Sequence, residues 1–158
     1  MPILTLITEI RAPIERVFDL SLSIDMHQAS MGGHGETAVA GVTTGLIALG
    51  QSVTWRARHF GVWQRLTSRV TALDRPRHFR DEMVSGAFAR FAHDHDFVEI
   101  PGGTRMTDTF DYTSPLGPLG KLADALGLAR YVRALLAERN QVILEVAQSE
   151  RWREFLPA

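Results

Sequence analysis

Residues 51–72, QSVTWRARHFGVWQRLTSRVTA, decide the fold, because apolar and polar side chains alternate along them with a period of two. The first half places Trp55 and Ala57 on one face and Arg56 and Arg58 on the other. Such alternation is typical of an antiparallel strand with one buried face. The second half alternates in the same way, so this stretch predicts a β-hairpin.

The register of this hairpin follows from its turn. We place the turn at residues 61–62, where glycine allows the chain to reverse. This turn pairs His59 with Gln64 and Ala57 with Leu66, which brings apolar side chains together on one face.

Residues 88–112 predict a second hairpin of the same kind. Gly102-Gly103 is a two-residue turn signal, and it pairs Phe97 with Asp108 and His95 with Phe110. The inward face then carries Phe91, His93, His95, Phe97, Met106, Asp108, Phe110 and Tyr112.

The flanking segments complete an α+β order. We expect strands at residues 3–10, 36–40 and 77–84. Pro13 is expected to open a short helix, Ser23 or Asp25 to cap a second one that runs to about Ser30, and a third to cover residues 119–126. A long helix is expected from 128 to 148, and Gly127 separates it from its predecessor. The strand at 77–84 is expected to point Phe79, Asp81 and Met83 inward. The long helix has an apolar stripe with Arg139 at its centre, so we expect Arg139 to bond an inward acid, Asp108 or Asp81.

Glycine-rich residues 31–50 and the turn at 117–127 are expected to form a mobile entrance to the interior. Leu46, Ile47 and Leu49 would cover what lies inside.

Composition restricts the classes of function. The 158 residues fit one domain, residues 1–158, with 17 basic and 18 acidic side chains and no block of like charge. We therefore expect neither a nucleic-acid partner nor stable membrane insertion. The absence of cysteine excludes disulfides, thiolate metal sites and a cysteine nucleophile. A cytoplasmic protein, monomer or dimer, is expected, and nothing in the sequence selects a protein partner.

Several motifs together resemble one superfamily. They are residues 12–18 (APIERVF) with Asp25 after them, 86–88 (GAF), 93–97 (HDHDF) and 103–108 (GTRMTD). The chain resembles the START/Bet v 1-like (SRPBCC) superfamily, in particular its bacterial polyketide cyclase/dehydrase-like branch. The resemblance implies a helix-grip fold, in which a curved antiparallel sheet wraps around a long C-terminal helix. It also implies a cavity between sheet and helix for one small, largely apolar ligand.

The candidate ligand-binding residues are those expected to face this cavity: Trp55, His59, Leu66, Asp81, Met83, Phe91, His93, His95, Asp108, Phe110, Tyr112, Leu135, Arg139 and Val142. Candidate catalytic residues are His93, His95, Asp108 and Arg139, because a His–Asp pair can move protons and an arginine can hold an oxyanion. The polar members either satisfy one another as a buried network or face a ligand. His93 and His95 are spaced as two metal ligands could be, with His59 or Asp108 as a third. No long-range motif supports a metal, and we expect neither metal nor cofactor.

Three functions compete. The first is binding of a lipid, fatty acid or aromatic, polyketide-like metabolite. The second is a cyclase, aromatase or dehydratase acting on a polyketide-like carbonyl compound, with Arg139 holding the oxyanion and His93 or His95 exchanging protons. The third is a protein-interaction module. No nucleophile or phosphate-binding motif is present in the sequence.

Overall fold

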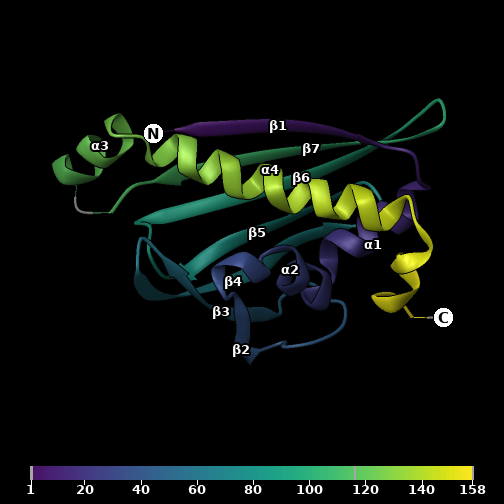
Figure 1. Cartoon of the computed structure of the whole chain (residues 1–158), viewed down its shortest axis with the longest axis horizontal. Helices are drawn as coiled ribbons and strands as arrows, with labels where there is room; N and C mark the ends of the chain where they lie inside the picture. Colours follow the sequence, from purple (N-terminus) through teal and green to yellow (C-terminus); the bar gives the residue numbers. More distant parts are fainter. Residues whose placement is uncertain (1, 116, 158) are drawn as a thin grey trace.

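The computed structural model describes residues 2–115 and 117–157 (Figure 1). Within them the elements run in this order: β1 (Ile3–Ile10), α1 (Ile14–Leu22), α2 (Ile24–Ser30), the 3-10 helix η1 (Gly32–His34), β2 (Thr37–Gly41), β3 (Ser52–His59), β4 (Val62–Asp74), β5 (His78–Ser85), β6 (Arg90–Ile100), β7 (Gly103–Thr113), α3 (Pro118–Ala125), α4 (Leu128–Ala147) and the 3-10 helix η2 (Glu150–Glu154). The expected elements are all present, and the expected break at Gly127 separates α3 from α4.

The described strands form one antiparallel sheet of seven strands in the order β1-β7-β6-β5-β4-β3-β2. The sheet curves, α4 lies along its inner side, and α1 and α2 lie beside α4 on that same side (Figure 1). The expected wrapping of a sheet around the last helix is therefore confirmed. Among the described residues, no helix is long and apolar enough to cross a membrane.

The first hairpin has the expected faces but a different register. His59 pairs with Val62, and Trp55, not Ala57, pairs with Leu66. The turn consists of Phe60 and Gly61, whose φ angles of 53° and 75° are both positive. Such a two-residue turn matches the twist of the flanking strands. The predicted pairing was wrong by two residues, and because side chains alternate with a period of two, the residues up to Val70 kept their faces. An irregularity between Val70 and Ala72 then changes the phase, so that Leu73 pairs with inward Phe79 and packs on the core in the place expected for Ala72.

The second hairpin shows the same error. Ile100 pairs with Gly103, so the turn is residues 101–102 and His95 lies opposite Asp108. Gly103 is the first residue of β7, and it is a glycine because a Cβ at this position would lie 2.1 Å from the backbone oxygen of Ile10. One of the two adjacent glycines therefore serves close packing of β7 against the end of β1, and only the other serves the turn.

Two apolar clusters hold the helices on the sheet. One packs α1, α2 and the second half of α4, through Ile143 and Val146, against the sheet. The other surrounds Phe91 and Phe110 and includes Val132 from the first half of α4. Buried Arg139 and Asn140 lie between Val132 and Ile143 along α4. A polar layer therefore separates the two parts of the core.

Candidate functional site

A cavity of about 410 Å³ lies between the sheet and α4. Its wall combines side chains from α1 and α2, from the inner faces of β3 to β7 and from α4. Most of them are apolar, with Trp55, Leu66, Phe91 and Leu135 among the larger ones. The interior of this fold therefore contains a pocket and is not filled completely by side chains.

Ten of the fourteen candidate ligand-binding residues line this cavity: Trp55, His59, Leu66, Asp81, Phe91, His93, His95, Phe110, Leu135 and Arg139. The expected inward direction of β5 is correct for Phe79 and Asp81, both of which reach the cavity wall.

The other four candidates do not line the cavity, and each has a physical reason. Asp108 is fully buried behind the histidines. The hydroxyl of Tyr112 donates to Asp124 Oδ1 at 2.9 Å and ties β7 to α3. Met83 packs on the apolar cluster around Phe91 and Phe110. Val142 packs on the other cluster, which holds α1, α2 and the second half of α4 on the sheet. Their predicted place in the cavity wall was wrong.

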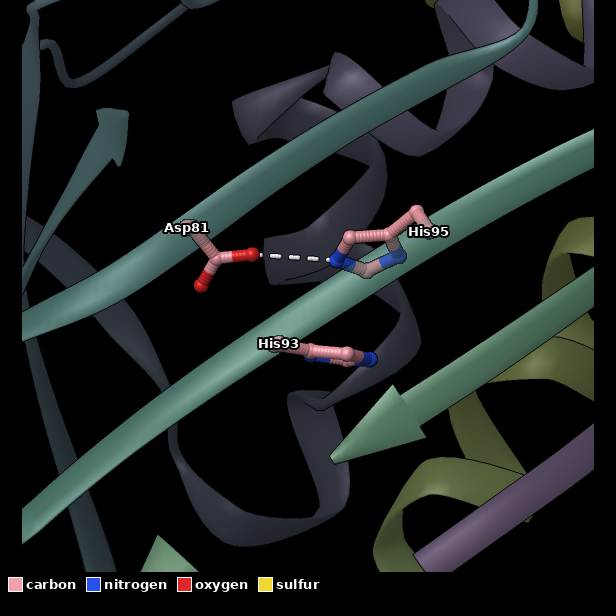
Figure 2. A group of neighbouring side chains, drawn as sticks. All are labelled: Asp81, His93 and His95. Atoms are coloured by element: carbon pink, nitrogen blue, oxygen red, sulfur yellow. Dashed lines mark hydrogen bonds and ion pairs between the residues drawn. The ribbon is translucent and has the colours of Figure 1, made fainter. Parts of the chain in front are cut away.

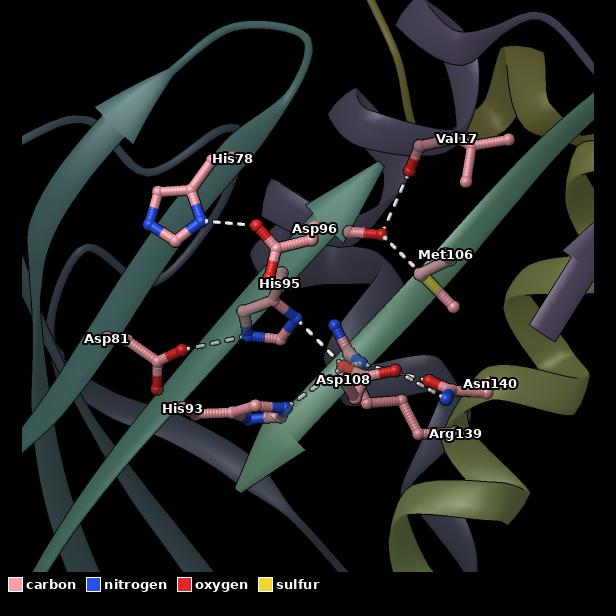
Figure 3. Close-up of polar contacts among 11 residues, drawn as sticks. Val17, His78, Asp81, His93, His95, Asp96, Met106, Asp108, Arg139 and Asn140 are labelled. Atoms are coloured by element: carbon pink, nitrogen blue, oxygen red, sulfur yellow. Dashed lines mark hydrogen bonds and ion pairs between the residues drawn. The ribbon is translucent and has the colours of Figure 1, made fainter. Parts of the chain in front are cut away.

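Asp108 is the centre of the polar layer (Figure 3). Its Oδ1 lies 2.9 Å from His93 Nε2 and 3.0 Å from His95 Nδ1, and its Oδ2 accepts from Asn140 Nδ2 at 2.6 Å. These distances depend on the register of β6 and β7, which sets Asp108 directly opposite His95. The expected pairing of Asp108 with Phe97 was therefore wrong, and Asp108 lies opposite His95.

Arg139 completes this layer from α4. Its Nη1 lies 3.5 Å from Asp108 Oδ1 and donates to Asn140 Oδ1 at 3.0 Å. The expected pairing of Arg139 with Asp108 is confirmed, although the shorter bond goes to Asn140. Sequence reasoning missed Asn140, whose only signal was a position next to Arg139 on the helix.

Asp81 approaches the same histidines from the neighbouring strand. Its Oδ1 lies 3.0 Å from His95 Nε2. In the pairing of β5 with β6, Asp81 lies directly opposite His93. The side chain of Asp81 is 23% exposed, and it lines the cavity. His95 is therefore held between two carboxylates, one buried and one facing the cavity.

The two histidines have opposite charge preferences. Burial disfavours a charged His95, but the carboxylates of Asp108 and Asp81 outweigh burial and raise its pKa. Burial and the neighbouring charge of His95 lower the pKa of His93, despite its hydrogen bond with Asp108. Of the two rings, His95 therefore favours the protonated form more strongly, and His93 favours the neutral form.

The two acids are both held in the ionised form. Burial alone would raise the pKa of Asp108, but the contacts with His93 and His95 outweigh it, and the pKa lies well below the ordinary value. The pKa of Asp81 is also lowered, since the hydrogen bond from His95 and the nearby positive charges overcome burial. Protonation of His95 would therefore balance the charges of Asp81, Asp108 and Arg139.

A second polar group lies at the α2 and β3 side of the cavity, and no sequence pattern indicated its pairings. His59 Nδ1 lies 2.8 Å from the Tyr131 hydroxyl, which connects β3 to α4. His27 Nε2 lies 2.6 Å from Glu36 Oε1. His27, Glu36, His59 and Tyr131 all line the cavity, so polar side chains are present at two places in its wall.

The segment at residues 41–50 is attached more firmly than its glycines suggested. Asp25 Oδ2 accepts from Gly45 N at 2.8 Å, and Gly50 N donates to Val70 O at 2.8 Å. Ile47 is buried in the cavity wall as expected, but Leu49 is 58% exposed and covers nothing. The mobility of this segment stays a prediction.

This combination of a curved sheet, a gripping C-terminal helix and an apolar cavity with a polar layer defines a small-molecule pocket protein of the helix-grip class. A family model described as polyketide cyclase/dehydrase and lipid transport matches residues 1–143, so the chain belongs to that family. The resemblance to the START/Bet v 1-like superfamily and its polyketide cyclase/dehydrase-like branch is confirmed.

Solved structures agree on the fold. The protein TTHA0849 from Thermus thermophilus is 21% identical, with a TM-score of 0.71 over 92% of this chain and 99% of that one. The major latex-like protein 151 from Panax ginseng is 14% identical, with a TM-score of 0.65 over 94% and 98%. The di-domain aromatase/cyclase StfQ of the steffimycin biosynthetic pathway is 11% identical, with a TM-score of 0.70 over 92% of this chain and 50% of StfQ. At these identities the likeness establishes the fold. No curated protein matches the sequence.

Proposed function

We propose that this protein binds one small, largely apolar molecule, such as a lipid, a fatty acid or an aromatic, polyketide-like metabolite. The observation that carries the proposal is the cavity of about 410 Å³ with a mainly apolar wall and a polar layer at one place. Pockets of roughly 300–1,000 Å³ are the usual size for small organic ligands. The family description supports this ligand class, because it includes lipid transport and polyketide cyclisation.

The cavity wall favours a ligand that has an apolar body and one polar head group. Burial of apolar surface contributes roughly 25 cal/mol per Å², so a ligand of this size gains most of its affinity from area. His93, His95 and Arg139 can hold a carbonyl or carboxylate by hydrogen bonds. A phosphorylated nucleotide or a sugar fits poorly, since several of its oxygens would lose water without finding donors.

A second candidate function is catalysis of the cyclase, aromatase or dehydratase type. It is favoured by one observation, the contact of two histidines and an arginine with the same cavity that would hold the substrate. In this version Arg139 stabilises the developing oxyanion of a carbonyl substrate and His93 or His95 exchanges protons with it. Asp108 keeps both histidines in place.

We propose that the protein acts in the cytoplasm as a monomer or dimer. Its partner is a small molecule and not a nucleic acid. The nearly equal numbers of basic and acidic residues, 17 and 18, support the absence of a nucleic-acid surface.

Mass spectrometry of the gently purified protein tests the proposal. We expect a co-purified apolar molecule that is released on denaturation and retained by the folded chain in a one-to-one ratio. Conversion of supplied aromatic or polyketide-like ketones would favour the enzyme instead. A protein that carries no such molecule and takes up none when offered fatty acids or ketones would contradict both functions and favour the interaction module.

A further inference from the structure

Asp81, His93 and His95 come together at one point of the cavity wall (Figure 2). Each offers one ligand atom, and these atoms all lie within 4.8 Å of one another. Two of the residues are two positions apart on β6, and the third faces them from the paired strand β5. The sheet therefore fixes the backbone positions of all three.

One nitrogen of each imidazole ring faces the same buried carboxylate, that of Asp108. Asp108 Oδ1 lies 2.9 Å from His93 Nε2 and 3.0 Å from His95 Nδ1. A histidine that binds a metal generally gives its other ring nitrogen to a carboxylate or carbonyl, which fixes the ring and its tautomer. Asp108 forms such a hydrogen bond with His93 and lies 3.0 Å from the same side of His95, which leaves His93 Nδ1 and His95 Nε2 for an ion.

One atom of the group is poorly satisfied in the present arrangement. His95 Nδ1 is buried and lies near Asp108, but among the described residues it makes no hydrogen bond of good geometry. Its other nitrogen, Nε2, is directed at Asp81 Oδ1 at 3.0 Å. A cation between Nε2 and Asp81 would replace the proton there and leave the proton on Nδ1 for Asp108.

We propose that Asp81, His93 and His95 bind a divalent transition metal ion, zinc being the probe of choice, with a coordination position open to the cavity. Two imidazoles and one carboxylate suit zinc, and three protein ligands with one open position are typical of reactive zinc sites. Adjacent ligand atoms around tetrahedral zinc are about 3.4 Å apart, given bonds of about 2.0–2.1 Å. Side-chain rotation must therefore draw the three atoms together by up to about 1.4 Å. Calcium and magnesium prefer sites made of oxygen, which this group is not.

The net charge of the site indicates which further ligand the bound ion would take. With neutral histidines, Asp81, Asp108 and Arg139 sum to one negative charge, and a divalent cation makes the layer positive by one. An anionic oxygen from the cavity, such as a carboxylate or enolate, restores neutrality. This inference goes beyond the proposed function, because the ion can bind whether or not an apolar molecule is present.

The chain contains a matched control on the outer face of the same strands. His78 on β5 lies 2.9 Å from Asp96 and 3.6 Å from Asp94, both on β6. This group also combines imidazole and carboxylates, but its side chains are 28–52% exposed on the outer face and its two acids face different ring nitrogens. Zinc that binds nonspecifically to histidine and carboxylate side chains would therefore also bind at His78.

The test is a calorimetric titration of zinc into chelator-treated protein, with cobalt(II) absorption spectra as a second readout. We expect one zinc ion per chain in the wild type. Asp81→Asn and His93→Gln should each lower zinc affinity by about 100-fold or more, since even the loss of a group supporting a ligand costs 10–100-fold. His78→Gln should change nothing. Asp81 is the main position to test because its side chain is partly exposed and its substitution leaves the buried contacts of Asp108 intact.

Three results would overturn the inference: no zinc binding by the wild type, equal affinity in Asp81→Asn, or loss of binding in His78→Gln. Titration of an apolar fluorophore into the chelator-treated protein separates this outcome from the proposed function. If the fluorophore binds while zinc does not, the metal site is wrong and the apolar pocket stands.

Discussion

Asp108 is a fully buried carboxylate that contacts side chains from two different elements of the fold. His93 and His95 reach it from β6, and Asn140 and Arg139 reach it from α4. A buried charge is tolerated when its oxygens are hydrogen-bonded and opposite charges are near. The contacts of Asp108 therefore connect the long helix to the middle of the sheet by charge as well as by apolar packing.

Arg139→Ala should destabilise the protein by about 3–5 kcal/mol, because it removes one partner of a buried pair and leaves Asp108 with less compensation. Arg130→Ala, on an exposed position of the same helix, should lie within about 0.5 kcal/mol of the wild type. Urea denaturation of the two variants measures the difference. Equal stability of both variants would show that the buried ion pair contributes nothing.

The sequence predicted Arg139 better than its neighbour Asn140. A charge in the middle of an apolar stripe is costly unless paired, so burial of Arg139 required an acid within reach. Asn140 carries no charge and lies next to the stripe, so periodicity alone gives it no reason to be buried. Its role depends on the distance between Asp108 and α4, and that distance follows from three-dimensional packing and not from spacing along the chain.

At the scale of elements, alternation predicted which face of each strand is buried but not which residues pair. A slip of two residues preserves every face, so the pattern of Trp55 and Ala57 could not correct the misplaced turn. In the first hairpin the actual turn uses Phe60 with a positive φ angle, which is unusual for an aromatic residue. Exposed Phe60 packs on Tyr131 with ring centroids 4.5 Å apart, a contact between the turn and α4 that no local pattern reveals.

Gly103→Ala should destabilise the sheet by about 1–3 kcal/mol, as overpacking generally does. The added Cβ would meet the backbone of Ile10, which cannot move without breaking the pairing of β1 with β7. Gly32→Ala is the control, because a Cβ there meets nothing within 4 Å and the backbone is not in the left-handed region. Thermal denaturation should separate the two. A neutral Gly103→Ala would mean that β1 does not approach β7 as closely as described.

His59 connects β3 to α4 through Tyr131, and its titration predicts a pH effect on stability. Burial lowers the pKa of His59 below its ordinary value of 6.5; Glu36 opposes this and His34 adds to it. The unfolded chain therefore binds a proton at His59 more readily than the folded chain does. The stability that neutral His59 contributes to the folded chain is lost as pH falls through 6.5. Between about pH 7 and 5.5 the free energy of unfolding should fall less steeply in His59→Gln than in the wild type. Equal slopes would contradict the lowered pKa.

At the scale of the whole molecule, the fold and the presence of a cavity followed from element order and from the family resemblance. The composition of the cavity wall followed in large part, because most candidates on the inner faces of strands β3 to β6 line the cavity, with Met83 on β5 as an exception. Met83, Asp108, Tyr112 and Val142 were assigned to the wall wrongly, since inward direction on a strand or helix does not distinguish a residue beside the cavity from one packed beneath it. His27 and Glu36 were missed because they come from separate elements with no shared pattern.

The pocket can be blocked without changing its polar layer. Ala57 lies in the cavity wall and is only 5% exposed, whereas its neighbour Arg58 is exposed on the other face of β3. Ala57→Phe fills part of the space that a ligand would occupy, and Arg58→Phe introduces the same side chain outside it. The pair of variants thus distinguishes binding inside the cavity from binding to the surface.

Titration of an apolar fluorophore, followed by competition, tests the central claim most directly. We expect saturable binding of one fluorophore per chain and its displacement by fatty acids or aromatic ketones, but not by nucleotides. Binding should be weaker in Ala57→Phe and unchanged in Arg58→Phe. Displacement by nucleotides but not by apolar acids and ketones, or equal binding in the wild type and Ala57→Phe, would contradict the claim.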